Sequence, residues 1–175
     1  MNIEEFLDQQ RAWLKHNFPS SGPDHQLMGI VEEVGELTHA ILKSEQKIRG
    51  TEQQHEEAMR DAIGDILIYS SAYCITSDLS VDDIKVAYYR PLLETQIKHS
   101  LRKTVWLKVV TSMSDFVSMA YGRKNLEPTV VKYYFTKFIA MVNSFSITCG
   151  FNAIEILSDT WNNVVAKRDW RPEEN

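Results

Sequence analysis

The amino-acid sequence predicts an all-α fold in a single domain. The chain has 175 residues, which is near the usual size of one domain and long enough to bury a hydrophobic core. It contains only 7 glycines and 5 prolines, and the segments between turn signals are about 16 to 30 residues long, a length that suits helices. No segment shows the apolar–polar alternation expected of a half-buried strand. Antiparallel bundle packing is then the natural way for the helices to share a core.

Helices are expected, in chain order, over residues 2–17, 24–47, 51–76, 80–89, 92–121, 128–149 and 152–168. The amphipathic pattern is clearest over 24–47, where apolar residues recur three and four positions apart. These residues are Leu27, Ile30, Val31, Val34, Leu37, Ile41 and Leu42. The next helix is expected to begin at Thr51, whose side chain can cap the first turn, with acidic residues close behind it.

Two later helices carry enough apolar surface that we expect them to be buried. The apolar residues of the first are Leu101, Val105, Leu107, Val109, Met113, Phe116 and Val117, and those of the second are Val131, Phe135, Phe138, Ile139, Met141, Val142 and Phe145. We therefore expect one domain over 1–175, with a hairpin at about 24–77, added helices at about 85–150 and a closing helix at about 152–170.

Composition narrows the class of partner. The net charge is -5 and the pI is about 5.5, which argues against a duplex-DNA or anionic-membrane binder, because those need a dominant basic surface. Cys74 and Cys149 lie in apolar stretches without metal-site spacing, so we interpret them as buried free thiols in a reducing compartment. The acidic start of the chain lacks the features of a signal peptide, and no apolar run is long enough to span a membrane. A cytoplasmic protein with small-molecule or protein partners is expected.

The acidic residues of the first long hairpin form the candidate site. Glu33 and Glu36 fall about 60° apart on one flank of the apolar stripe, and Glu32 points further towards solvent. Asp61 and Asp65 are spaced i and i+4, so they project from one face of the next helix. In an antiparallel hairpin the acids of one helix can face those of the other.

Carboxylates gathered in this way favour a divalent cation. An ionised carboxylate at the head of an apolar stretch, as at Asp65, costs several kcal/mol unless it is paired or binds a metal. All-oxygen ligation is what Mg²⁺ prefers, with Mn²⁺ also possible. The alternative that spacing alone leaves open is an exposed acidic face with Asp65 capped by a neighbouring polar group.

The same residues carry a resemblance to a known family. Glu-Glu-Val-Gly-Glu-Leu at 32–37 followed by Asp-Ala-Ile-Gly-Asp-Ile-Leu at 61–67 resembles the MazG-like family of all-α nucleoside triphosphate pyrophosphohydrolases, whose hallmark is ExxE, a spacer and ExxD. The segment 39–50 and the closing Trp-Asn-Asn-Val-Val-Ala-Lys-Arg-Asp-Trp at 161–170 are also similar to segments of such proteins. The resemblance implies a helical bundle of that type, here with an added helical pair, and cleavage of nucleoside or deoxynucleoside triphosphates into monophosphate and pyrophosphate.

The resemblance also implies roles for the acids. Glu33 and Glu36 match ExxE and Asp65 matches the last acid of ExxD, so these residues and the nearby Asp61 are the expected Mg²⁺ ligands. Glu33 or Glu36 is expected to accept the proton of the attacking water. The first acid of ExxD is replaced by Ala62, and Asp61 lies about 100° round the helix from that position. The number of metal ions is therefore left open.

The resemblance and side-chain chemistry together suggest residues for the substrate. Lys167 and Arg168 are candidates for the triphosphate, because Arg offers a planar fork and Lys a compact charge. Arg49 and Lys47 in the hairpin turn can also reach phosphates, and Asn162 or Asn163 can contact sugar or base. Trp13, Trp106, Trp161 and Trp170 are candidates to stack on a base, although large aromatic residues are more often core. Members of the family tend to pair subunits, so a homodimer is expected, in which the added helices either pack on the hairpin of their own chain or widen the dimer contact.

Two rival functions remain. Glu36 with His39 and Glu52 with His55 have the ExxH spacing of carboxylate-bridged di-iron bundles, but Glu52 and His55 fall at one end of the hairpin, more than three turns from Glu36. The other rival is a catalytically weak or idle helical protein that binds nucleotides or a partner, which the missing acid at position 62 favours.

Overall fold

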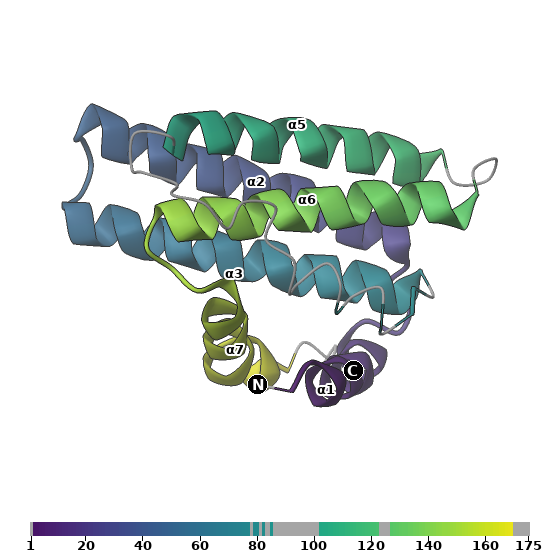
Figure 1. Ribbon diagram of the computed structural model, residues 1–175. Coiled ribbons are helices and arrows are strands. Elements are labelled where there is room, and N and C mark those ends of the chain that lie inside the picture. The colour runs from purple at the N-terminus through teal and green to yellow at the C-terminus, as the bar shows by residue number, and fades with distance from the viewer. Residues whose placement is uncertain are drawn as a thin grey trace.

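The computed structural model describes residues 2–77, 79, 80, 82, 85, 102–122 and 127–169. In these ranges every regular element is a helix, which confirms the predicted all-α class (Figure 1). The elements are α1 (Ile3–Asn17), α2 (Pro23–Gln46), α3 (Glu52–Thr76), α5 (Arg102–Tyr121), α6 (Pro128–Thr148), α7 (Ala153–Asn163) and the short 3₁₀ helix η3 (Val165–Lys167). The helix predicted over 80–89 and the first part of the one predicted over 92–121 lie almost wholly outside the described residues.

Local sequence explains where the helices begin. The Thr51 side chain accepts a hydrogen bond from the backbone N–H of Gln54, and the Gln54 side chain accepts one from the N–H of Thr51. This reciprocal cap confirms Thr51 as the predicted start of the helix, because it satisfies two backbone donors that the first turn leaves unpaired. Asn152 caps α7 in a similar way, by accepting hydrogen bonds from two backbone N–H groups.

The closing helix is shorter than predicted. Instead of running to residue 168, α7 ends at Asn163, and Val164 has the non-helical angles φ -121° and ψ -71°. Tertiary contacts explain the break, because Val165 is buried in the core and the backbone carbonyl of Arg168 accepts a hydrogen bond of 3.0 Å from the indole N–H of Trp13. Both contacts require the chain to turn back towards α1.

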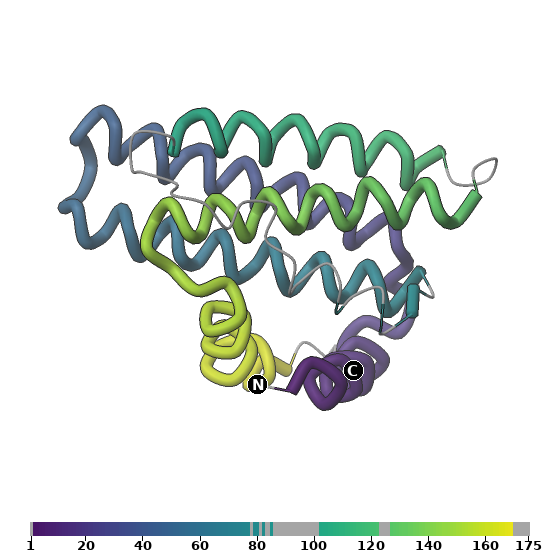
Figure 2. The backbone as a smooth tube through the Cα atoms, viewed as in Figure 1, coloured from purple at the N-terminus to yellow at the C-terminus, as the bar shows by residue number. Residues whose placement is uncertain are grey.

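Four long helices, α2, α3, α5 and α6, lie side by side, and α1 and α7 lie across one side of this bundle (Figures 1 and 2). The main contacts are those of α2 with α3, of α5 with α6 and of α3 with α7. Contacts of α2 with α5 and of α3 with α6 join the two pairs. The added helices therefore pack on the acidic hairpin within one chain, which is one of the two placements expected from the sequence.

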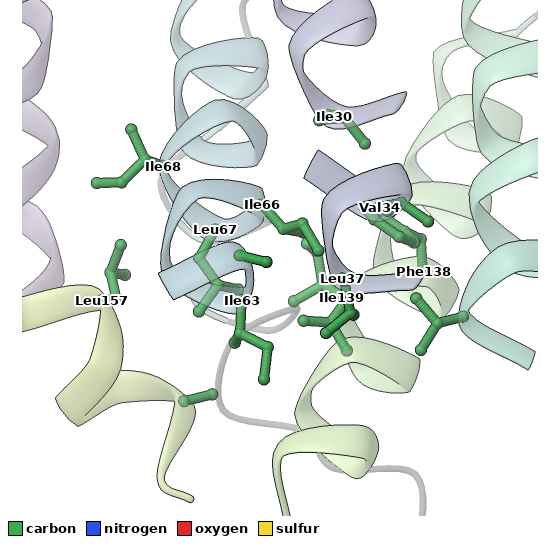
Figure 3. Packing of buried hydrophobic residues seen from close by; sticks show 14 of the residues in the cluster. Ile30, Val34, Leu37, Ile63, Ile66, Leu67, Ile68, Phe138, Ile139 and Leu157 are labelled. Carbon is green, nitrogen blue, oxygen red and sulfur yellow. The ribbon is translucent and has the colours of Figure 1, made fainter. Parts of the chain in front are cut away.

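One hydrophobic core runs through the bundle. Figure 3 shows side chains of α2, α3 and α6 meeting, among them Leu37, Ile66 and Ile139, all of which are fully buried. The predicted apolar face of α6 is buried in full. The amphipathic pattern was wrong at three positions, since Val31, Leu42 and Leu107 are 43%, 47% and 52% exposed. Val31 and Leu42 lie at the border of the buried stripe of α2, whereas Leu107 lies on the face of α5 opposite Val105 and Phe116, because successive helical residues are 100° apart.

Cys74 and Cys149 are buried, and neither forms a disulfide within the described residues, as predicted. In the described residues, no single helix is long and apolar enough to cross a membrane. Helix α6 reaches the necessary length and apolar character only together with the segment 153–167, and the two are bent by 96° relative to each other.

Candidate functional site

Close packing at a glycine sets the register of the acidic hairpin. A Cβ atom on Gly29 would overlap the ring of Tyr69, so only glycine lets α2 approach α3 this closely at that point. Because the two helices run antiparallel, four residues further along α2 lies opposite four residues back along α3. The Gly29–Tyr69 contact thereby places Glu33 opposite Asp65.

Glu33 is a buried acid, with a relative exposure of 9%. Its Oε2 atom is buried and has no hydrogen-bond partner within the part of the chain that the structure describes. Burial is the main cause that raises the pKa of Glu33 to about 8, and the negative charges of Asp65, Glu36, Glu32 and Asp61 add to the shift. A carboxylate in this position needs a cation or a proton.

Asp65 is half-buried and faces the same group of charges. Burial and the neighbouring Asp61 raise the pKa of Asp65 to about 6, while the Arg168 guanidinium acts in the opposite direction. Arg168 is therefore close enough to Asp65 to affect its charge, although the two residues are far apart in the sequence. The short 3₁₀ helix η3, which follows α7, leads the chain to this position.

Glu33 and Asp65 line a cavity of about 350 Å³ between α1, α2, α3 and the segment after α7. We call it the inner cavity. Its other lining residues are Gln10, Trp13, Leu14, Phe18, Ser21, His25, Gln26, Ile68, Tyr69, Ala72, Val165 and Arg168. Burial raises the pKa of the Tyr69 hydroxyl, and nearby carboxylates, with Glu33 first, raise it further. One side of the cavity thus carries two acids and one arginine. The other side carries mainly aromatic and amide side chains.

The remaining predicted acids lie in a second, more open cleft of about 650 Å³, which we call the outer cleft. It is lined by Glu32, Gly35, Glu36, His39, Ala40, Lys43, Arg49, Gln54, His55, Ala58 and Asp61. Arg49 has a left-handed backbone with φ of 57°, which a non-glycine residue adopts only at some cost. The α2–α3 hairpin therefore presents acids to two neighbouring hollows, with Lys43 and Arg49 beside the outer one.

Ala62 explains how this chain departs from the ExxD pattern. Its side chain is 3% exposed and belongs to the hydrophobic core, so a carboxylate there would be buried among apolar groups. Asp61 is exposed and lines the outer cleft, and its charge raises the pKa of both Glu33 and Asp65. Asp61 thus lies beside Glu33 and Asp65, but on a different face of α3 from position 62.

The chemistry of these donors fits a hard divalent cation, because all are carboxylates and one buried oxygen is unpaired. Among the described residues, no three histidine, cysteine or acidic side chains are already gathered closely enough to hold a metal ion. Glu36 and Asp61 are exposed, so their side chains can change rotamer without repacking the core. Metal binding would therefore need side-chain rotation towards Glu33 and Asp65.

The other predicted substrate residues are dispersed. Lys167 is exposed and lines neither hollow. Asn162 lies in a small separate cleft with Trp161, and donates a hydrogen bond to Ser158. Both stay predictions, whereas Arg168 and Arg49 lie beside the acids.

The tryptophans divide between core and cavity. Trp161 is buried, Trp106 donates a hydrogen bond to Thr38, and Trp170 lies outside the described residues. Trp13 alone of the three described tryptophans lines the inner cavity. The ring of His55, which the di-iron interpretation would use, is hydrogen-bonded to the carbonyl of Ile48 in the hairpin turn.

Sequence reasoning missed Gln10, His25 and Tyr69 in the inner cavity. Gln10 had a detectable signal, since it occupies a buried position in the apolar stripe of α1, whose other members are Ile3, Phe6, Leu7 and Leu14. A polar residue at such a position needs a hydrogen-bond partner.

In comparisons with known proteins, no family model, no curated protein and no solved structure matches this chain.

Proposed function

We propose that this protein is a metal-dependent nucleoside triphosphate pyrophosphohydrolase with a helical bundle of the MazG-like type. The observation that carries the proposal is the buried, unpaired Oε2 of Glu33, opposite Asp65 at the wall of a cavity large enough for an organic ligand. A carboxylate oxygen without a partner in such a place is costly for the fold. That cost is accounted for if the site binds a cation and a phosphorylated substrate.

In this proposal Glu33, Glu36, Asp61 and Asp65 would hold Mg²⁺, or Mn²⁺ in its place. The bound metal would supply charge neutralisation of phosphate oxygens and a lowered pKa of water. The acids themselves have to turn towards one another across the hairpin, which the exposed Glu36 and Asp61 can do. The Gly29–Tyr69 contact holds their backbones in register.

The remaining residues would bind and orient the triphosphate. Arg168 lies by Asp65 and can pair with phosphate oxygens, and Arg49 and Lys43 can do so from the outer cleft. Water attacks the α-phosphorus, the bond to the bridging oxygen breaks, and pyrophosphate leaves. Glu33 is better placed than Glu36 to accept the proton of that water, because Glu33 lines the inner cavity.

The test is release of pyrophosphate from a panel of ribo- and deoxynucleoside triphosphates with Mg²⁺. We expect Glu33→Gln and Asp65→Asn each to lower the rate on the order of 100-fold, because each removes a charge worth several kcal/mol at nearly constant volume. Circular dichroism should show an unchanged helical content. Glu45→Gln is the matched control, since Glu45 lies on α2, is exposed and pairs with Lys103.

Retention of more than about a tenth of the rate in either variant would exclude that residue from the site. Nucleotide binding by calorimetry without pyrophosphate release from any member of the panel would instead favour the idle binding protein. The buried Ala62, which supplies no ligand where the family pattern has one, is the observation that favours this second candidate.

A further inference from the structure

Gln10 presents a buried hydrogen-bond acceptor that none of the described residues engages. Its side chain is 0% exposed, and its Nε2 donates a hydrogen bond of 2.9 Å to the backbone carbonyl of Ile68. Its Oε1 is buried and has no hydrogen-bond partner among the described residues. The amide cannot be reversed, because its oxygen would then face the Ile68 carbonyl oxygen. The free atom is therefore an acceptor, and it needs a donor.

The Gln10 amide lies close to the acidic wall of the inner cavity. Ile68, which holds the Gln10 amide, follows Asp65 by three residues, or about 4.5 Å along the axis of α3. Gln10 also lines the inner cavity together with Glu33 and Asp65. The cavity of about 350 Å³ exceeds by about tenfold the space that one water molecule occupies in the liquid. A larger group with a donor can fill it.

The wall beside Gln10 is aromatic. Trp13 follows Gln10 by about one turn of α1 and lines the same cavity. Its indole N–H donates a hydrogen bond to the carbonyl of Arg168, and its ring makes T-shaped contacts with the rings of Phe18 and Trp161, at centroid distances of 5.5 and 6.2 Å. With its one donor engaged, Trp13 offers the cavity an apolar ring surface, which suits a flat heterocycle.

Two residues of the inner cavity can supply hydrogen-bond donors. The Nδ1 of His25 accepts a hydrogen bond from the backbone N–H of Gly22, so in the neutral ring the proton is on Nε2 and is available as a donor. Tyr69, whose hydroxyl is a donor, also lines the cavity. One unpaired acceptor, two donor groups and an aromatic wall match the edge and face of a nucleobase, which carries N–H groups next to acceptor atoms.

We propose that Gln10 is a specificity-determining residue, whose Oε1 accepts a hydrogen bond from an N–H group of the substrate's base while the base lies in the inner cavity beside Trp13. This inference rests on the proposed function for the position of the triphosphate. It adds which group of the substrate the α1 side of the cavity recognises.

The experiment compares a nucleoside triphosphate with ribose 5-triphosphate, which carries the same phosphates and has no base. Dissociation constants are measured by calorimetry for the wild-type chain and for Gln10→Met, which removes the amide at similar volume. We expect the variant to bind the best natural nucleotide of the panel about tenfold or more weakly, as for a lost buried hydrogen bond. Binding of ribose 5-triphosphate should change less than about twofold. The KM for pyrophosphate release should follow the same pattern.

Gln9→Met is the matched control. Gln9 precedes Gln10 on α1 and its Oε1 accepts a hydrogen bond from the indole of Trp161, so this variant reports the structural effect of losing a glutamine amide. Its affinity for both ligands should equal that of the wild type. An equal loss of both ligands in Gln10→Met, or no loss of either, would overturn the inference.

Failure of the proposed activity and failure of the base site give different results. If no nucleotide releases pyrophosphate but Gln10→Met still weakens nucleotide binding selectively, the proposed activity is wrong and the base site stands. If pyrophosphate is released but Gln10→Met binds both ligands with the affinity of the wild type, the activity stands and the base site is refuted.

Discussion

In the proposed function, the single side chain of Glu33 would link folding to metal binding. Its burial opposite Asp65 raises the pKa to about 8 from the ordinary 4.5. The folded, metal-free chain therefore binds a proton at Glu33 at pH values where the unfolded chain does not. A cation that binds there has to displace this proton.

The stability of the metal-free protein should consequently fall as pH rises. For an acid whose pKa is higher in the folded state, the favourable contribution is complete below the unfolded pKa and is lost as pH rises through the folded one. The window for Glu33 runs from about pH 4.5 to about 8. We expect the thermal midpoint in EDTA to decline across this window, and the stabilisation by Mg²⁺ to grow across it. Differential scanning calorimetry of wild type and Glu33→Gln checks this, since the variant should lose most of both trends. A Mg²⁺ effect that does not vary with pH would contradict the prediction.

Asp61 is the acid whose role the sequence pattern left open. It is exposed, but its charge acts on Glu33 and Asp65. If it is a metal ligand, Asp61→Ala should raise the Mg²⁺ concentration for half-maximal activity by about tenfold, as loss of a coordinating or supporting group does. Glu57→Ala, about one turn earlier on α3, should leave the titration unchanged. Identical metal titrations in wild type and Asp61→Ala would remove Asp61 from the metal site.

At the scale of the elements, two glycines allow neighbouring helices to pack closely. Gly29 makes room for the Tyr69 ring between α2 and α3, and a Cβ on Gly64 would overlap the Thr160 side chain of α7. Gly64 directly precedes Asp65, so the approach of α7 and the segment after it, including Arg168, is fixed next to this acid. Small residues thus determine which charges meet.

A pair of alanine substitutions on α2 tests whether Gly29 sets the register of α2 against α3. Gly29→Ala should destabilise the protein by about 1–3 kcal/mol, because the new methyl group pushes against a packed ring, and should also reduce pyrophosphate release by displacing Glu33 from Asp65. Gly35→Ala is the control, since nothing lies within 4 Å of a Cβ there. It should stabilise the helix by about 0.5–1 kcal/mol. Urea unfolding measures both values, and equal effects of the two substitutions would refute the role given to Gly29.

Sequence periodicity predicted the elements well but not their long-range contacts. Spacing alone identified the buried face of α6, most of that of α2, and the expectation that acids of the two hairpin helices face each other; which acids lie opposite follows from the Gly29–Tyr69 contact. It could not place Gln10, because the partner of its amide is Ile68, which is 58 positions away. The early end of α7 was missed for a similar reason, since the hydrogen bond from Trp13 to Arg168 spans 155 positions. Such contacts depend on how helices dock, which local patterns do not encode.

At the scale of the whole molecule, α5 and α6 continue the core of the acidic hairpin. Phe116 of α5 is fully buried. Its ring makes edge contacts with Tyr73 of α3 and Phe135 of α6, at centroid distances of 5.1 and 5.5 Å. Phe138 stacks on it at 5.9 Å. The four long helices are thus supplied by one chain. The homodimer stays a prediction, and its measure is a molar mass by light scattering of twice 20.2 kDa.

This shared core predicts that the molecule unfolds as one unit. Phe116→Ala should cost about 3–5 kcal/mol, as expected for a large aromatic residue removed from a packed interior. Tyr121→Ala on the same helix should cost less than about 0.5 kcal/mol, because Tyr121 is 77% exposed. Since Tyr73 links the ring of Phe116 to the helix that carries Asp65, the loss should lower the stability of the acidic hairpin as much as that of α5 and α6. Thermal unfolding followed by far-ultraviolet circular dichroism and by tryptophan fluorescence should then give one coincident transition in both variants. Two separate transitions, with Mg²⁺ raising only one of them, would mean that α5 and α6 form an appendage and that the acidic hairpin, with α1 and α7, folds independently.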